Sequence, residues 1–291
     1  MLEIARHKVV SAAKRTGISL KQTYAKECKT LRRKAGGYAH AKQFRRLKRV
    51  VKRQRTILGI VMREVQRKLE EPGFVALNAK ALSDLTMWLE RAERIRTQQR
   101  HDKKKLYALH APEVECIGKG KAHKPYEFGV KVSIATTLNH SGGGQFIAHA
   151  KALPGNPYDG HTLASVLPDM QKQIGGTINC IVADKGYRGH NAPKDYKFKV
   201  YISGQKRGLT DAIKRDLRRR SAVEPVIGHA KSEHRMDRNY LKGSQGDAIN
   251  AVLAAAGYNF RRLLAWLRRL LRVWMMLMLS KNQPLSQAIA A

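Results

Sequence analysis

The chain has 291 residues and carries 57 Lys and Arg against 22 Asp and Glu, a formal net charge of +35 at pH 7. This length allows one large domain or two modest domains with their own cores. The excess of positive charge goes far beyond what solubility needs, so it indicates a polyanionic partner, either nucleic acid or an anionic membrane surface.

The N-terminal third is predicted to be helical and strongly basic. Residues 1–110 hold 29 Lys and Arg and 9 Asp and Glu. One or two basic helices are expected over residues 2–35. Apolar residues recurring every three, four and seven positions predict a long helix from Tyr38 to about Glu70, and a second amphipathic helix follows from about Asn78 to Gln99. We therefore expect residues 1–105 to form a segment built on a long basic helical hairpin.

The basic residues of the predicted long helix are clustered. Eight Lys and Arg fall between Lys42 and Arg55, with no acidic residue among them. Such a helix face is suited to DNA phosphates, and binding of this kind weakens as salt rises. The candidate DNA-binding residues of this helix are Arg45, Arg46, Arg49 and Arg53.

The pattern changes after residue 105, where strands and helices alternate. Alternating apolar residues from Tyr126 to Thr137 and a second run from Gln145 to Ala152 predict a β-hairpin. The other elements expected here are a short strand over residues 113–117, a helix over 161–174, strands over 178–184 and 197–202, and helices over 209–236 and 248–279. These elements predict an α/β domain over residues 106–280.

Neither end of the chain predicts a membrane segment, and the cysteines predict a reducing compartment. Met1 to Arg15 lacks the apolar core of a signal peptide. The apolar run from Trp274 to Leu279 is short of the roughly 20 residues that span a bilayer. Cys28, Cys116 and Cys180 form no C-x-x-C pair, which argues against a disulfide framework or a zinc ribbon. We expect a cytoplasmic protein with no membrane partner.

Two carboxylates are candidates for a metal site. Asp184 follows the apolar run Ile181-Val182-Ala183, so it is expected at the end of a buried strand. Glu224 lies among basic residues on a predicted helix. Mg²⁺ prefers oxygen ligands and combines one or two carboxylates with substrate phosphates. The alternative interpretation is that Asp184 caps a helix and Glu224 forms a surface ion pair.

These residues resemble those of a known family, the bacterial insertion-sequence transposases of the DDE class. Asp184-Lys185-Gly186-Tyr187 is similar to the segment around the second Asp of that family. Arg220, Glu224 and Lys231 match its signature of Arg, three residues, Glu, six residues and Lys, although Leu217 stands where a related signature has Tyr. Further similar stretches begin at Tyr126, Pro154 and Gly243, so the resemblance extends over most of the chain.

The resemblance implies a ribonuclease H-like mixed sheet flanked by helices, and DNA cleavage and strand transfer at transposon ends. It implies Asp184 and Glu224 as catalytic metal ligands for Mg²⁺ or Mn²⁺, and Arg220 and Lys231 as DNA-binding residues. It also implies double-stranded DNA as the partner, both as transposon ends and as target, with a homo-oligomer possible on the DNA. No residue matches the first Asp of the family, so we expect a truncated or split product that is inactive alone.

Other interpretations remain open from the sequence. The main alternative is a non-catalytic DNA-binding remnant of a transposase, and a third class is a structural RNA-binding protein. Asp159 is expected to serve as a turn or helix-capping residue. His229 and Glu233 are four residues apart, as zinc ligands can be, but no third ligand accompanies them.

Overall fold

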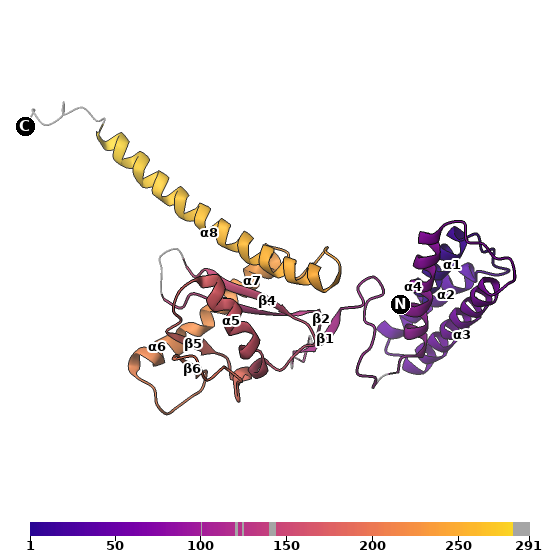
Figure 1. Ribbon diagram of the computed structural model, residues 1–291, viewed down its shortest axis with the longest axis horizontal. Coiled ribbons are helices and arrows are strands. Elements are labelled where there is room, and N and C mark those ends of the chain that lie inside the picture. The colour runs from indigo at the N-terminus through magenta and orange to yellow at the C-terminus, as the bar shows by residue number, and fades with distance from the viewer. Residues whose placement is uncertain (100, 120–121, 124, 140–143, 282–291) are drawn as a thin grey trace, which may run out of the picture. The chain divides into compact units, whose positions relative to one another are not determined.

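The computed structural model describes residues 1–99, 101–119, 122–123, 125–139 and 144–281. The chain divides into two compact units, Met1–Cys116 and Ile117–Ala291. The first unit is helical, and the second combines helices with three two-stranded sheets (Figure 1). The expected α/β class is therefore confirmed at this coarse level.

Four helices form the first unit. They are α1 (Leu2–Arg15), α2 (Ala25–His40), α3 (Phe44–Leu69) and α4 (Ala79–Thr97). α1 packs against both α3 and α4, and α2 packs against α3. The helices expected over residues 2–35, 38–70 and 78–99 are thus present, but the expected hairpin is not confirmed as a separate unit, because α1 packs against both α3 and α4.

Small residues on one face of α1 allow this close packing. Ala5, Val9, Ala12 and Ala13 recur at helical spacing and are at most 1% exposed. Facing them are fully or almost fully buried side chains of α3 and α4, including Leu58, Val61, Val65 and Leu85. A longer side chain at Ala5, Ala12 or Ala13 would separate the helices, because protein cores hold few voids.

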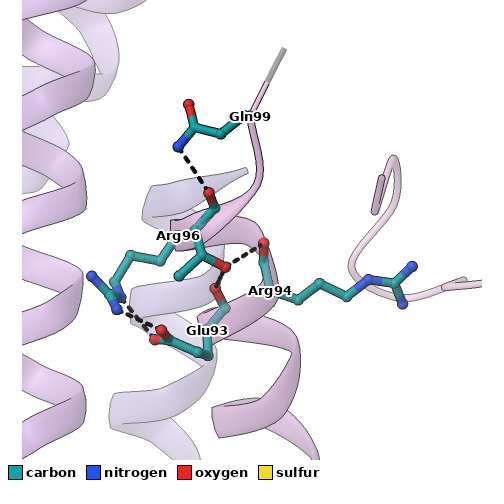
Figure 2. A network of polar contacts seen from close by, with 5 residues as sticks. Glu93, Arg94, Arg96 and Gln99 are labelled. Atoms are coloured by element: carbon teal, nitrogen blue, oxygen red, sulfur yellow. Dashed lines mark hydrogen bonds and ion pairs between the residues drawn. The ribbon is translucent and has the colours of Figure 1, made fainter. Parts of the chain in front are cut away.

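Local hydrogen bonds complete the last turn of α4 (Figure 2). Arg96 holds Glu93 with two hydrogen bonds, and this contact lowers the pKa of Glu93. The Thr97 hydroxyl donates to the Glu93 carbonyl at 2.8 Å, and Gln99 donates to the Thr97 carbonyl at 3.0 Å. The Gln99 bond occupies the Thr97 carbonyl, one of the last carbonyl groups that a helix leaves without a partner inside the helix.

The strands of the second unit form pairs. β3 (Lys131–Thr136) runs antiparallel to β4 (Ile147–Leu153), and β5 (Cys180–Ala183) runs parallel to β6 (Lys199–Ile202). The predicted hairpin is thus confirmed. β1 (Glu115–Gly118) pairs with β2 (Tyr126–Gly129). The run expected as one strand over residues 126–137 is divided at Gly129, whose φ of 148° interrupts the extended backbone.

One helix, α5 (Leu163–Ile174), covers strands from two of these pairs. Its buried side chains Leu163 and Leu167 belong to a cluster that also includes Ala135 of β3 and Ile181 of β5. The helix has an apolar stripe of the kind that packs on a sheet face. The β3–β4 and β5–β6 pairs therefore share one core although no hydrogen-bonded ladder joins them among the described residues.

The helix expected over residues 209–236 is divided into three elements. These are α6 (Asp211–Arg219), the 3₁₀ turn η3 (Arg220–Ala222) and α7 (Val223–Ser232). Pro225 explains the division, because its ring is tolerated in the first turn of a helix but breaks a helix interior. The division places Arg220 and Glu224 at the junction between α6 and α7.

The last helix, α8 (Gly243–Lys281), differs between its two halves. Ala251, Ala254 and Tyr258 are buried, and this half of α8 packs against β4. Farther along, apolar side chains such as Trp266 and Trp274 are about half exposed, and the helix extends past the strands (Figure 1). No helix in the described part of the chain is long and apolar enough to cross a membrane. Cys28, Cys116 and Cys180 are free cysteines.

Truncating Leu58 in the core of the first unit should strongly reduce the stability of the protein. Leu58→Ala should lower the free energy of unfolding by about 2–5 kcal/mol, because it removes buried methyl groups and leaves a cavity. Denaturant titration followed by circular dichroism measures this. Leu77→Ala is the matched control, since Leu77 is 77% exposed and its truncation should cost much less. Equal losses of stability in the two variants would contradict this packing.

A buried histidine of β4 predicts that stability depends on pH. His149 is 3% exposed, and its burial lowers its pKa from the ordinary value of 6.5. Between the lowered pKa and about 6.5 the unfolded chain binds the proton more readily, so stability should fall as pH falls through this range. His149→Gln should reduce this pH dependence of the unfolding midpoint, whereas His123→Gln, at an exposed position, should leave it unchanged.

Candidate functional site

Asp184 lies at the C-terminal end of β5, as the sequence predicts. Its side chain is 57% exposed and accepts a hydrogen bond from the Lys185 backbone N–H at 2.6 Å. In this way Asp184 caps the 3₁₀ turn η2 (Lys185–Tyr187). The capping role that was the alternative interpretation is therefore present, and it fixes the carboxylate at the strand end, where it can still face other groups.

Arg220 joins Asp184 to Glu224. One guanidinium nitrogen lies 3.2 Å from Asp184 Oδ1, and another lies 3.1 Å from Glu224 Oε1. Arg220 and Glu224 are four residues apart, so the helical turn from η3 into α7 places them on one face. The Arg220 side chain is 19% exposed, and the two carboxylates are 57% and 68% exposed. Two carboxylates about forty residues apart in the sequence thus contact the same guanidinium group.

This arrangement offers oxygen ligands beside a basic group. Carboxylate oxygens are the ligands that Mg²⁺ prefers, and Mg²⁺ usually takes only one or two of them from the protein. The donor atoms of Asp184 and Glu224 therefore fit a hard divalent cation. Within the described residues no group of three or more His, Cys, Asp and Glu is gathered as metal ligands. The pair would need further oxygens from water or substrate.

Lys231 contacts a different carboxylate. Its ammonium group donates to Glu127 Oε2 at 3.3 Å, and Lys119 reaches the same oxygen at 2.8 Å. Burial alone would raise the pKa of Glu127, but the two lysines outweigh it and the pKa is lowered. Glu127 lies on β2, where the sequence left the direction of its side chain open. No pattern in the sequence identified Lys119 as a partner of this group.

Asp159 lies beside the turn that Asp184 caps. Its carboxylate accepts from Lys131 Nζ at 3.0 Å, and Oδ2 would be only 2.7 Å from a Cβ added to Gly186. Gly186 belongs to the turn that Asp184 caps. Asp159 also precedes α5 in a 3₁₀ turn, so the expected turn role is present. The proximity was not visible in the sequence, because it depends on how two turns pack together.

The zinc interpretation of His229 and Glu233 gains no third ligand in the described part of the chain. His229 Nδ1 lies 3.0 Å from Glu233, and Arg261 of α8 forms an ion pair with the same carboxylate. The ion pair between Arg261 and Glu233 therefore links the end of α7 to α8, which is a structural role.

The candidate DNA-binding arginines of α3 differ in their surroundings. Arg45, Arg46 and Arg49 are exposed. Arg53 is also exposed but forms an ion pair with Glu27 of α2 at 2.7 Å, which compensates its charge. The exposed basic surface of α3 is therefore carried mainly by the first three arginines and the neighbouring lysines.

Part of the chain that contains this site matches a known protein family. Residues 178–264 match the family model described as the transposase DDE domain. This stretch is therefore similar to the DDE domain of transposases. No curated protein and no solved structure matched the chain.

The four residues carried over from the transposase signature all fall within the matched stretch. They are Asp184, Arg220, Glu224 and Lys231. The match supports a relationship to DDE-class transposases for this part of the chain. It also extends through the first half of α8, which packs on β4.

Proposed function

We propose that the second unit is the catalytic domain of an insertion-sequence transposase that cleaves and joins DNA strands at transposon ends. The observation that carries the proposal is the meeting of Asp184 and Glu224 at Arg220, inside a stretch that matches the transposase DDE domain. Chance would rarely bring two carboxylates so far apart in the sequence to one guanidinium at a strand end.

Asp184 and Glu224 are the proposed ligands of Mg²⁺ or Mn²⁺. When bound, such ions activate the attacking oxygen and stabilise the leaving oxygen of an in-line phosphoryl displacement. The surroundings of the pair suit a phosphodiester. Arg220 can donate two parallel hydrogen bonds to phosphate oxygens once it leaves a carboxylate.

Arg220 holds the carboxylates together in the absence of another cation. Two exposed carboxylates brought close repel each other, and the guanidinium between them cancels part of that repulsion. A divalent cation and Arg220 would compete for the same oxygens. We propose that metal binding frees Arg220 from at least one carboxylate and leaves it available to the DNA backbone.

The proposed fold of this domain is ribonuclease H-like. Its support is that α5 packs on both β3 and β5, so the two strand pairs lie under one helix as parts of one mixed sheet would. An experimental structure in which β3 and β5 pack on opposite sides of α5, in two separate sheets, would contradict this assignment.

A non-catalytic DNA-binding remnant is the second candidate. It is favoured by the donor count, because the described residues gather two carboxylates and no third. Two carboxylates are poorly equipped to hold two ions about 4 Å apart. Each 1.36 kcal/mol of lost transition-state stabilisation lowers the rate about tenfold. This second candidate predicts that the chain binds DNA but cleaves it too slowly to measure. Readily measured cleavage that is lost in Glu224→Gln would exclude the remnant.

Metal binding tests the proposed site directly. Asp184→Asn and Glu224→Gln should each weaken Mn²⁺ binding by about tenfold or more, equivalent to about 1.4 kcal/mol, because each removes an anionic ligand. Arg220→Gln should strengthen it, because a competing cation is removed. Titration calorimetry, or paramagnetic resonance of free Mn²⁺, measures all three.

The matched control for the metal titration is Glu233→Gln. Glu233 follows the end of α7 and forms an ion pair with Arg261, so its replacement should leave Mn²⁺ binding unchanged. Wild-type affinity in both Asp184→Asn and Glu224→Gln would show that the metal site is misplaced.

DNA binding by the first unit is proposed to use the exposed face of α3. Neutralising Arg45, Arg46 and Arg49 together should weaken binding to duplex DNA. It should also flatten the plot of log affinity against log salt by about 0.9 for each phosphate that the variant no longer neutralises. Arg53→Gln should have a smaller effect, because Glu27 already compensates its charge. Fluorescence anisotropy over a salt series measures both, and a wild-type affinity that is independent of salt would refute DNA binding through charge.

A further inference from the structure

We propose that Lys119, Glu127 and Lys231 form a second phosphate-binding site, in which Glu127 positions the two lysines for the DNA backbone. The proposal rests on the proposed function, since it assumes that this unit binds DNA. It adds Lys119 as a DNA contact and Glu127 as a positioning residue.

Geometry is the first support. Both ammonium groups lie on the same carboxylate oxygen, at 2.8 Å for Lys119 and 3.3 Å for Lys231. The two positive charges are therefore held within a few ångströms of each other. Without Glu127 they would repel, and two flexible lysine side chains would move apart. Glu127 removes that repulsion and much of the rotational freedom of both side chains.

The remaining hydrogen-bonding capacity is the second support. Each lysine ammonium has three donors, and Glu127 takes one from each. The three side chains are between 30% and 38% exposed, so the remaining donors can reach solvent or a ligand. The cluster carries a net charge of +1. Its ligand is therefore anionic and rich in acceptors, as a backbone phosphate is.

The position of the cluster on α7 is the third support. Lys231 lies seven residues after Glu224, which is two helical turns and about 10.5 Å along the axis. A strand whose reacting phosphate lies at Asp184 and Glu224 would thus bring a nearby phosphate of the same strand to the lysine pair.

The backbone around Lys119 favours a fixed position. The Lys119 N–H donates to the Pro125 carbonyl at 2.8 Å, so the residue after β1 is bonded to the residue before β2. Glu127 follows on β2 and contacts Lys119. Lys231 of α7 contacts the same carboxylate from a distant part of the chain. Residues from a strand turn and from a distant helix therefore meet at one carboxylate.

The decisive test is Glu127→Gln, because the proposal and a simple charge argument predict opposite results. The substitution raises the net charge by one, so binding governed by net charge alone should become tighter. The proposal predicts weaker binding to a short mixed-sequence DNA duplex, because the lysines lose the carboxylate that aligns them. Binding as tight as wild type, or tighter, would overturn it.

The lysines provide the second part of the experiment. Lys119→Gln and Lys231→Gln should each reduce the slope of log affinity against log salt by about 0.9 in magnitude. Lys119→Arg should keep the wild-type slope. Lys172→Gln on α5 is the matched control, since it removes the same charge at an exposed position away from the cluster. A slope for Lys119→Gln equal to that of Lys172→Gln would overturn the role of Lys119.

Two outcomes separate this inference from the proposed function. Thermal unfolding midpoints near the wild-type value show that a variant is folded, so that weaker binding can be assigned to the site. If wild-type binding itself does not depend on salt, the DNA-binding function fails. If wild-type binding is steeply salt-dependent and the cluster variants behave like Lys172→Gln, only the inference about the cluster fails.

Discussion

The candidate site depends on the contact of one guanidinium with two carboxylates. Arg220 reaches Asp184 at the end of β5 and Glu224 at the start of α7, and so connects a strand end to a helix that follows about forty residues later. Exposed ion pairs contribute little to stability, commonly less than about 1 kcal/mol. The contact therefore matters less for holding the fold than for setting the positions of the two carboxylates.

The surrounding fold makes that contact possible by placing the junction between α6 and α7 beside β5. α5 packs on the strands from one face, and the first half of α8 packs against β4. α7 begins at Val223 after the 3₁₀ turn and has Pro225 in its first turn, which sets the direction in which Glu224 and Lys231 project. Without this break, one continuous helix would carry Arg220 and Lys231 along a single stripe toward the same neighbours.

Charge is distributed differently in the two units. In the first, small residues of α1 let four helices pack closely, and most basic side chains remain on the outside, where Arg53 is one of those with an acidic partner. In the second, carboxylates are interposed between basic groups, as at Glu127 between Lys119 and Lys231. The first arrangement suits non-specific attraction to a polyanion. The second suits alignment of a backbone at defined points.

The sequence by itself determined the local features of this protein. Apolar periodicity located most helices and the hairpin of β3 and β4, and the apolar run before Asp184 predicted its strand-end position, because these signals depend only on neighbouring residues. Tertiary structure alone decided which distant groups meet: Arg220 with Asp184, Lys231 with Glu127, Asp159 with the turn at Gly186. It also decided that α1 packs against both α3 and α4 in the first unit. Such contacts arise from the packing of whole elements, and no spacing within one element encodes the direction from which a distant side chain approaches.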